Sequence, residues 1–160
     1  MRLFGNAKRR QDEIVLDPAY KGLRSQALNT KPADIGVTLD NNEQVYAAVA
    51  DIPTKNGIST LVCVIGGTVS LYYSNGGGLI GLGQKYEEVR SAGNSFLISA
   101  GQMIPYLAKA VDFGISEDQK AVVFLLARDG YIIGRYREAL SAGVELSGIL
   151  LCDRRYHFFQ

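Results

Sequence analysis

The sequence predicts an α+β fold, in which an antiparallel sheet of about five strands carries helices mainly on one face. Three observations support this prediction. Three extended runs follow one another between residues 45 and 74, a stripe of apolar residues repeats at helical spacing from 89 to 107, and an Asp-Gly pair joins two later extended runs.

The first predicted element is a short amphipathic helix from about 18 to 29. Asp17 can accept hydrogen bonds from free amides at a helix start, and Pro18 suits the first helical position. Pro32 stops the pattern and is followed by a loop. The apolar positions on the buried face are Tyr20, Leu23, Ala27 and Leu28.

Three strands are predicted next, over residues 45–52, 59–65 and 68–74. They are rich in β-branched and aromatic residues, and Asn56-Gly57 and Gly66-Gly67 mark the turns between them. Every second residue of the third run is polar or a tyrosine, so we expect one face on the core and one wetter face that carries Ser70, Tyr72 and Ser74.

A long helix is predicted from about 84 to 107, with a bend near Gly101 or Pro105. A stripe of this kind is typical of a core and not of a cofactor site. The stripe consists of Val89, Ala92, Phe96, Leu97, Ala100, Met103, Ile104 and Leu107.

Asp129-Gly130 predicts a hairpin between residues 121–127 and 131–137, because this pair favours tight turns. A second helix is expected over 138–151, interrupted by Gly143 and Gly148. With residues 1–16 as a flexible N-terminal leader, residues 17–160 form a single predicted α+β domain.

Composition and charge exclude several functions. The 160-residue chain has a formal net charge of +1, which provides no field to attract nucleic acid or an anionic membrane. Its start lacks the apolar segment of a signal peptide, so we expect a cytoplasmic protein. The lone His157 near the C-terminus and the widely separated Cys63 and Cys152 form no catalytic or metal-ligand pattern, so we expect no catalytic residue, metal or cofactor.

The segment from 66 to 83 holds seven of the 18 glycines and needs a special explanation. Gly76, Gly78 and Gly81 fit the pattern G-x-G-x-x-G, but the preceding strand belongs to a hairpin meander and not to the βαβ unit of a dinucleotide site. The Gly-Lys-Ser/Thr ending of a P-loop is also missing.

Two functions remain open. The favoured one is a non-enzymatic interaction or assembly module, for example a homodimer, that contacts a protein partner through Ser70, Tyr72, Leu79 and Ile80. The alternative is a small-molecule or anion-binding protein, and even an enzyme, that uses the loop 74–85. Its candidate ligand residues are Ser74, Gly76, Gly77, Gly78, Gly81, Lys85 and Arg90. If Leu79 and Ile80 are buried, the glycines serve the fold, whereas if they are exposed, the loop is a contact surface.

The run from 70 to 81, Ser-Leu-Tyr-Tyr-Ser-Asn-Gly-Gly-Gly-Leu-Ile-Gly, resembles a segment of small uncharacterised bacterial proteins. The element order as a whole is similar to that of profilin-like and roadblock-like domains. The first resemblance implies a bacterial cytoplasmic protein, and neither implies an activity or a catalytic residue.

Overall fold

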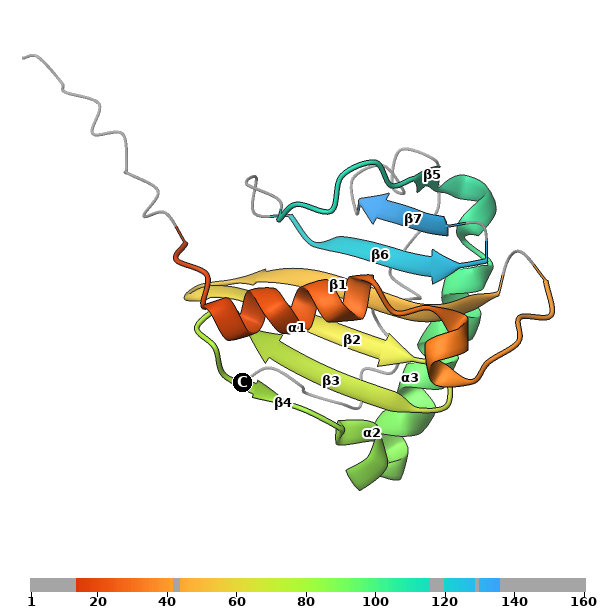
Figure 1. Cartoon of the computed structure of the whole chain (residues 1–160), viewed down its shortest axis with the longest axis horizontal. Helices are drawn as coiled ribbons and strands as arrows, with labels where there is room; N and C mark the ends of the chain where they lie inside the picture. Colours follow the sequence, from red (N-terminus) through yellow and green to blue (C-terminus); the bar gives the residue numbers. More distant parts are fainter. Residues whose placement is uncertain (1–13, 42–43, 116–119, 129, 136–160) are drawn as a thin grey trace, which may run out of the picture.

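The computed structural model describes residues 14–41, 44–115, 120–128 and the backbone of 130–135. The predicted helix over 138–151, Cys152, His157 and residues 1–13 of the predicted leader lie outside the described residues. At the centre of the described structure is one antiparallel sheet with the strand order β4-β3-β2-β1-β6-β7-β5 (Figure 1).

Helix α1 (Pro18–Leu28) confirms the first predicted element. The Asp17 carboxylate accepts a hydrogen bond of 2.7 Å from the amide of Ala19, which satisfies one of the free donors at the helix start. A short 3-10 helix, η1 (Pro32–Ile35), follows and ends at Gly36, which has a φ of 67°.

Five strands of six or more residues confirm the predicted α+β fold. Strands β1 (Val45–Thr54), β2 (Gly57–Val64) and β3 (Thr68–Tyr73) form the meander, and β6 (Val122–Ala127) and β7 (Gly130–Arg135) form the hairpin. The two-residue strands β4 (Gly78–Leu79) and β5 (Ala108–Lys109) lie at the two edges of the sheet. β1 is the central strand because it pairs with β2 on one side and with β6 on the other.

The predicted long helix is divided into three pieces, namely α2 (Leu82–Lys85), α3 (Glu87–Gly101) and the 3-10 helix η2 (Ile104–Tyr106). Tyr86 separates α2 from α3 because its backbone is extended, with φ −127° and ψ 118°. The expected bend near Gly101 is the end of α3. Within the predicted stripe Leu97, Ala100 and Met103 are buried, but Ala92 is exposed and its neighbour Gly93 is buried instead.

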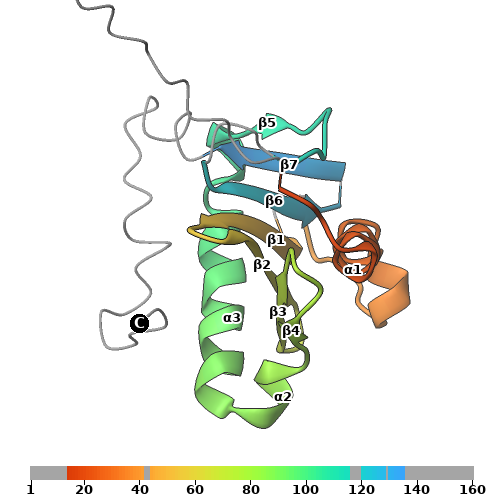
Figure 2. The ribbon, with the colours of Figure 1, turned by 90° about the vertical axis from the view of Figure 1, so that its left-hand side faces the viewer.

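Helices lie on both faces of the sheet. Figure 2 shows α3 along one face and α1 along the other. We expected helices mainly on one face, and α2 and α3 do share one, while α1 covers the opposite face. A register shift in β1 between Val45 and Ala47 lets the adjacent residues Tyr46 and Ala47 both join the core under α1. The described part of the chain therefore has two cores, one on each side of a single sheet.

Candidate functional site

The glycine segment is shaped by close backbone approaches. A Cβ atom on Gly83 would collide with the carbonyl oxygen of Gly67, and one on Gly78 would lie 2.8 Å from the carbonyl oxygen of Leu71. Gly76 has a φ of 93°, and a Cβ there would lie 2.6 Å from the carboxylate carbon of Asp17. These positions require glycine for the fold itself, whether or not the segment binds anything.

The amides proposed as an anion cradle donate within the segment. The N–H of Gly76 donates to the carbonyl of Tyr73 at 2.9 Å, and that of Gly77 donates to the Asn75 side chain at 3.1 Å. The N–H of Gly81 donates to the hydroxyl of Ser70 at 3.2 Å. An anion at this position would have to displace these hydrogen bonds before it could use the amides.

The predicted ligand side chains have partners inside the protein. Ser74 is buried, and its hydroxyl accepts a 3.0 Å hydrogen bond from the amide of Ile58. The Lys85 ammonium lies 5.2 Å from the ring centroid of Tyr86, and Arg90 forms an ion pair with Glu87 one turn away on α3. The structure therefore assigns these three side chains contacts of their own and does not show them converging on one point.

The predicted interaction face needs a correction. Ser70 and Tyr72 are only 2% and 8% exposed. Tyr72 belongs to the core under α1, and the Ser70 hydroxyl lies against the backbone amide of Gly81. Burying this face costs little, since the Ser70 and Ser74 hydroxyls accept hydrogen bonds from backbone amides. Leu79 and Ile80, by contrast, are 50% and 70% exposed. Of the four predicted contact residues, these two remain available to a partner.

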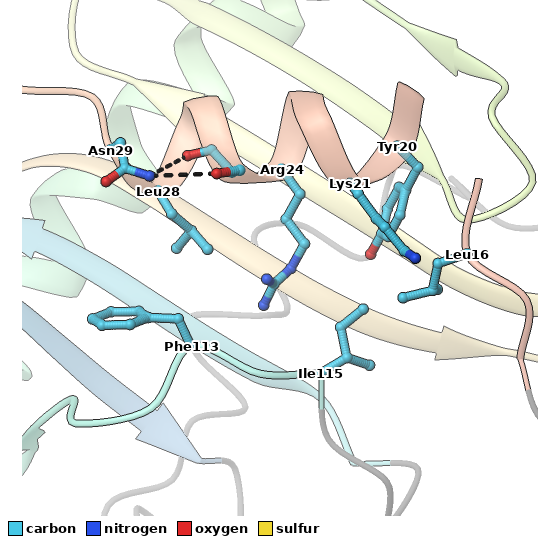
Figure 3. A pocket seen from close by; sticks show the side chains of 9 residues that line it. Leu16, Tyr20, Lys21, Arg24, Leu28, Asn29, Phe113 and Ile115 are labelled. Atoms are coloured by element: carbon cyan, nitrogen blue, oxygen red, sulfur yellow. Dashed lines mark hydrogen bonds between the residues drawn. The ribbon is translucent and has the colours of Figure 1, made fainter. Parts of the chain in front are cut away.

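A pocket of about 430 Å³ lies between α1 and the segment 113–115 (Figure 3). No residue in the predicted sites lines it, so the sequence reasoning missed this feature. The lining side chains combine apolar groups with lysine and arginine: Leu16, Tyr20, Lys21, Arg24, Ser25, Leu28, Asn29, Phe113 and Ile115.

A buried polar network stands behind this pocket. Arg24 and Asp51 form an ion pair, with Nη2 of the arginine 2.6 Å from Oδ2 of the aspartate. The Thr60 hydroxyl donates to Asp51 Oδ1 at 2.7 Å, so it must accept the hydrogen bond from the Tyr20 hydroxyl, also 2.7 Å away. Burial raises the pKa of Tyr20, so the phenol keeps the proton that it donates to Thr60.

The sequence did contain a signal for the ion pair. Arg24 lies four residues after Tyr20 and four before Leu28, in the middle of the apolar stripe of α1. Asp51 extends the uninterrupted buried run of β1. A charged residue at each of these positions is expected to have a buried partner, because an unpaired charge there would be very costly.

In the part of the chain that the structure describes, no three His, Cys, Asp or Glu side chains gather in a way that could hold a metal ion. None of the helices in those same residues has the length and apolar character needed to cross a membrane.

Comparisons with known proteins found no matching family model, no matching curated protein and no matching solved structure. Any argument about function therefore rests on the residues themselves.

Proposed function

We propose that the protein is a non-enzymatic interaction module of the bacterial cytoplasm that associates through the β4 edge of its sheet. We define the contact edge as residues 78–80. The observation that supports this proposal is the exposure of Leu79 and Ile80 at β4, which is the last strand on one side of the sheet within the described residues. An edge strand presents unpaired backbone donors and acceptors, and adjacent apolar side chains give a partner strand something to cover.

The backbone of the contact edge is held in place by the body of the protein. Leu79 and Gly78 pair with Leu71 and Tyr72 of β3, and the close fit at Gly78 brings the two backbones together. A rigid edge loses little conformational entropy on binding, so more of the gain from apolar burial appears as affinity. Complete burial of an aliphatic side chain contributes roughly 1.5–3 kcal/mol.

We propose a second copy of the chain as the partner. The contact edge is short and antiparallel to β3, so two copies can pair edge to edge around a twofold axis with the same residues on both sides. Tyr86, also exposed and six residues beyond Ile80, is available to widen such a contact.

Sedimentation velocity or light scattering over a range of protein concentrations tests this function. We expect the wild-type mass to rise with concentration, and Ile80→Glu to shift the association to at least about tenfold higher concentration, because it places two charges in the dimer contact. The matched control is Ile98→Glu on α3, where the isoleucine is 71% exposed but distant in sequence from the edge. A wild-type mass that stays monomeric throughout, or equal effects of the two variants, would refute self-association through the contact edge.

A further inference from the structure

The pocket beside α1 has a chemical character that the contact edge does not explain. Among the described residues, its lining contains the cationic groups of Lys21 and Arg24 and no acidic side chain. The remaining walls are largely apolar, and Figure 3 shows Arg24 extending from α1 into the space between Phe113 and Ile115. Such a combination suits a ligand with one anionic end and an apolar body.

Arg24 is fixed in position before any ligand arrives. Its Nε lies 3.0 and 3.1 Å from the two carboxylate oxygens of Asp51, and its Nη2 lies 2.6 Å from one of them. The guanidinium carbon is also 5.5 Å from the centroid of the buried Phe124 ring. Asp51 therefore holds one edge of the guanidinium, and the Phe124 ring lies against its face. Only 11% of the arginine side chain is exposed.

This arrangement directs one amino group of Arg24 away from Asp51. A guanidinium is planar, with its three nitrogens spread evenly around the central carbon, so Nη1 points opposite to the edge formed by Nε and Nη2. Within the described residues Nη1 makes no hydrogen bond, and no buried side-chain nitrogen or oxygen there lacks a partner. Nη1 is therefore reached by solvent, and Arg24 is one of the residues that line the pocket.

The balance of charge favours a monoanion. Among the described residues around the pocket, Asp51 compensates the charge of Arg24, and the exposed Lys21 adds one further positive charge at the rim. The volume of about 430 Å³ lies within the range of roughly 300–1,000 Å³ that is typical of small-molecule sites.

We propose that this pocket binds a small amphipathic carboxylate. Its carboxylate accepts hydrogen bonds from Arg24 Nη1 and from the Lys21 ammonium, and its apolar body packs against Leu28, Phe113 and Ile115. A carboxylate fits better than a phosphate ester dianion, because the described lining offers about one uncompensated positive charge and mainly apolar walls.

Isothermal titration calorimetry with 4-phenylbutyrate as the probe tests the proposal, with its neutral amide and inorganic phosphate as comparison ligands. We expect the carboxylate to bind at least about tenfold more tightly than the amide, because only the carboxylate forms hydrogen bonds in which both partners are charged. Inorganic phosphate, which has no apolar body, should not bind. Equal binding of the carboxylate and the amide, or equal binding of phosphate, would overturn the proposal.

Variants locate the binding. Lys21→Ala should weaken binding of the carboxylate by about tenfold, and Lys55→Ala, which removes the same charge from the exposed turn between β1 and β2, should leave it unchanged. Ser25→Trp should abolish binding by filling the pocket from the exposed side of α1. Full binding by both Lys21→Ala and Ser25→Trp would show that the ligand binds elsewhere and would overturn the proposal. Ile80→Glu should bind the probe as wild type does, so this test is independent of the contact edge.

Discussion

The two faces of the sheet are stabilised in different ways. The face under α1 contains a buried ion pair, a hydroxyl chain and a pocket. The core under α3 is apolar and combines small residues such as Cys63 and Ala100 with larger ones such as Leu97. On the α1 face, the charged side chain of Arg24 is paired with Asp51. On the α3 face, Gly83 lets the backbone of α2 come close to the carbonyl of Gly67. The comparison teaches that substitutions on the two faces fail for different reasons, namely an unpaired charge on one and steric collision on the other.

The largest effect is expected from breaking the ion pair under α1. Asp51→Ala leaves the buried Arg24 charge without its partner, so we expect a loss of about 3–5 kcal/mol in the free energy of unfolding. Urea unfolding followed by circular dichroism measures this loss.

Two further variants separate the cost of leaving Arg24 unpaired from the loss of its attraction to Asp51. Arg24→Met combined with Asp51→Leu removes both charges and should be more stable than Asp51→Ala alone. Asp40→Ala, at an exposed position before β1, should change the stability by less than about 0.5 kcal/mol. If Asp51→Ala is no more harmful than Asp40→Ala, the ion pair does not stabilise this face.

Steric collision on the other face is tested at Gly83. Gly83→Ala would drive a methyl group into the carbonyl of Gly67, so we expect a loss of about 1–3 kcal/mol as α2 is pushed off the turn between β2 and β3. The control is Gly22→Ala in α1, where the added methyl group meets no atom within 4 Å apart from the adjacent backbone of its own helix. It should raise stability by about 0.5–1 kcal/mol, because alanine is the better helix former. Equal losses in the two variants would contradict a specific contact at Gly83.

The apolar character of the α3 face also predicts a dependence on pH. Burial raises the pKa of the Cys63 thiol to about 12 from its ordinary 9.0, so folding favours the protonated form. The contribution of this thiol to the free energy of unfolding is complete below pH 9 and is lost as the pH rises from 9 through 12. By pH 10 the loss should be about 1 kcal/mol, relative to a Cys63→Ala variant followed over the same range.

Alkylation checks the same burial independently. In a Cys152→Ser background, iodoacetamide at pH 8 should modify Cys63 very slowly in the folded protein and quickly in urea, because the buried thiol is both inaccessible and protonated. Rapid modification of the folded protein would mean that α3 does not cover Cys63.

The smallest effect is expected at the surface of α3. Glu87 and Arg90 form an ion pair one turn apart, and both side chains are largely exposed to solvent. Glu87→Gln should lower stability by no more than about 0.5 kcal/mol, and 0.5 M salt should reduce this difference further. A loss above 1 kcal/mol would show that the pair does more than an ordinary surface contact.

Local patterns were sufficient to predict most of the fold. The start of α1 follows from Asp17 and Pro18, and the hairpins follow from glycine-containing turns, because a few adjacent residues determine these features. The extended residue at Tyr86 was not predicted. Beside it, α2 packs through Gly83 against Gly67, which lies sixteen residues earlier in the chain, and no local pattern specifies such a contact.

The pocket and the buried face of β3 depend on where α1 is placed. Serine and tyrosine at alternate positions of β3 fit either a solvated face or one covered by a helix, and only the tertiary structure decides between them. The pocket exists because residues 113–115 return to α1 from a distant part of the chain, which no local pattern specifies.

The strand order also has a consequence for how the chain folds. One edge of β1 meets its neighbour β2 across a tight turn, but its other edge pairs Val45 with Ala127 and Asp51 with Val122, partners that are 82 and 71 residues away in the chain. Closing so long a loop is entropically costly, so we expect the meander to form first, while one edge of β1 is still unpaired. Until β6 pairs with β1, this unpaired edge is where the folding chain is most prone to form a strand pair with another molecule.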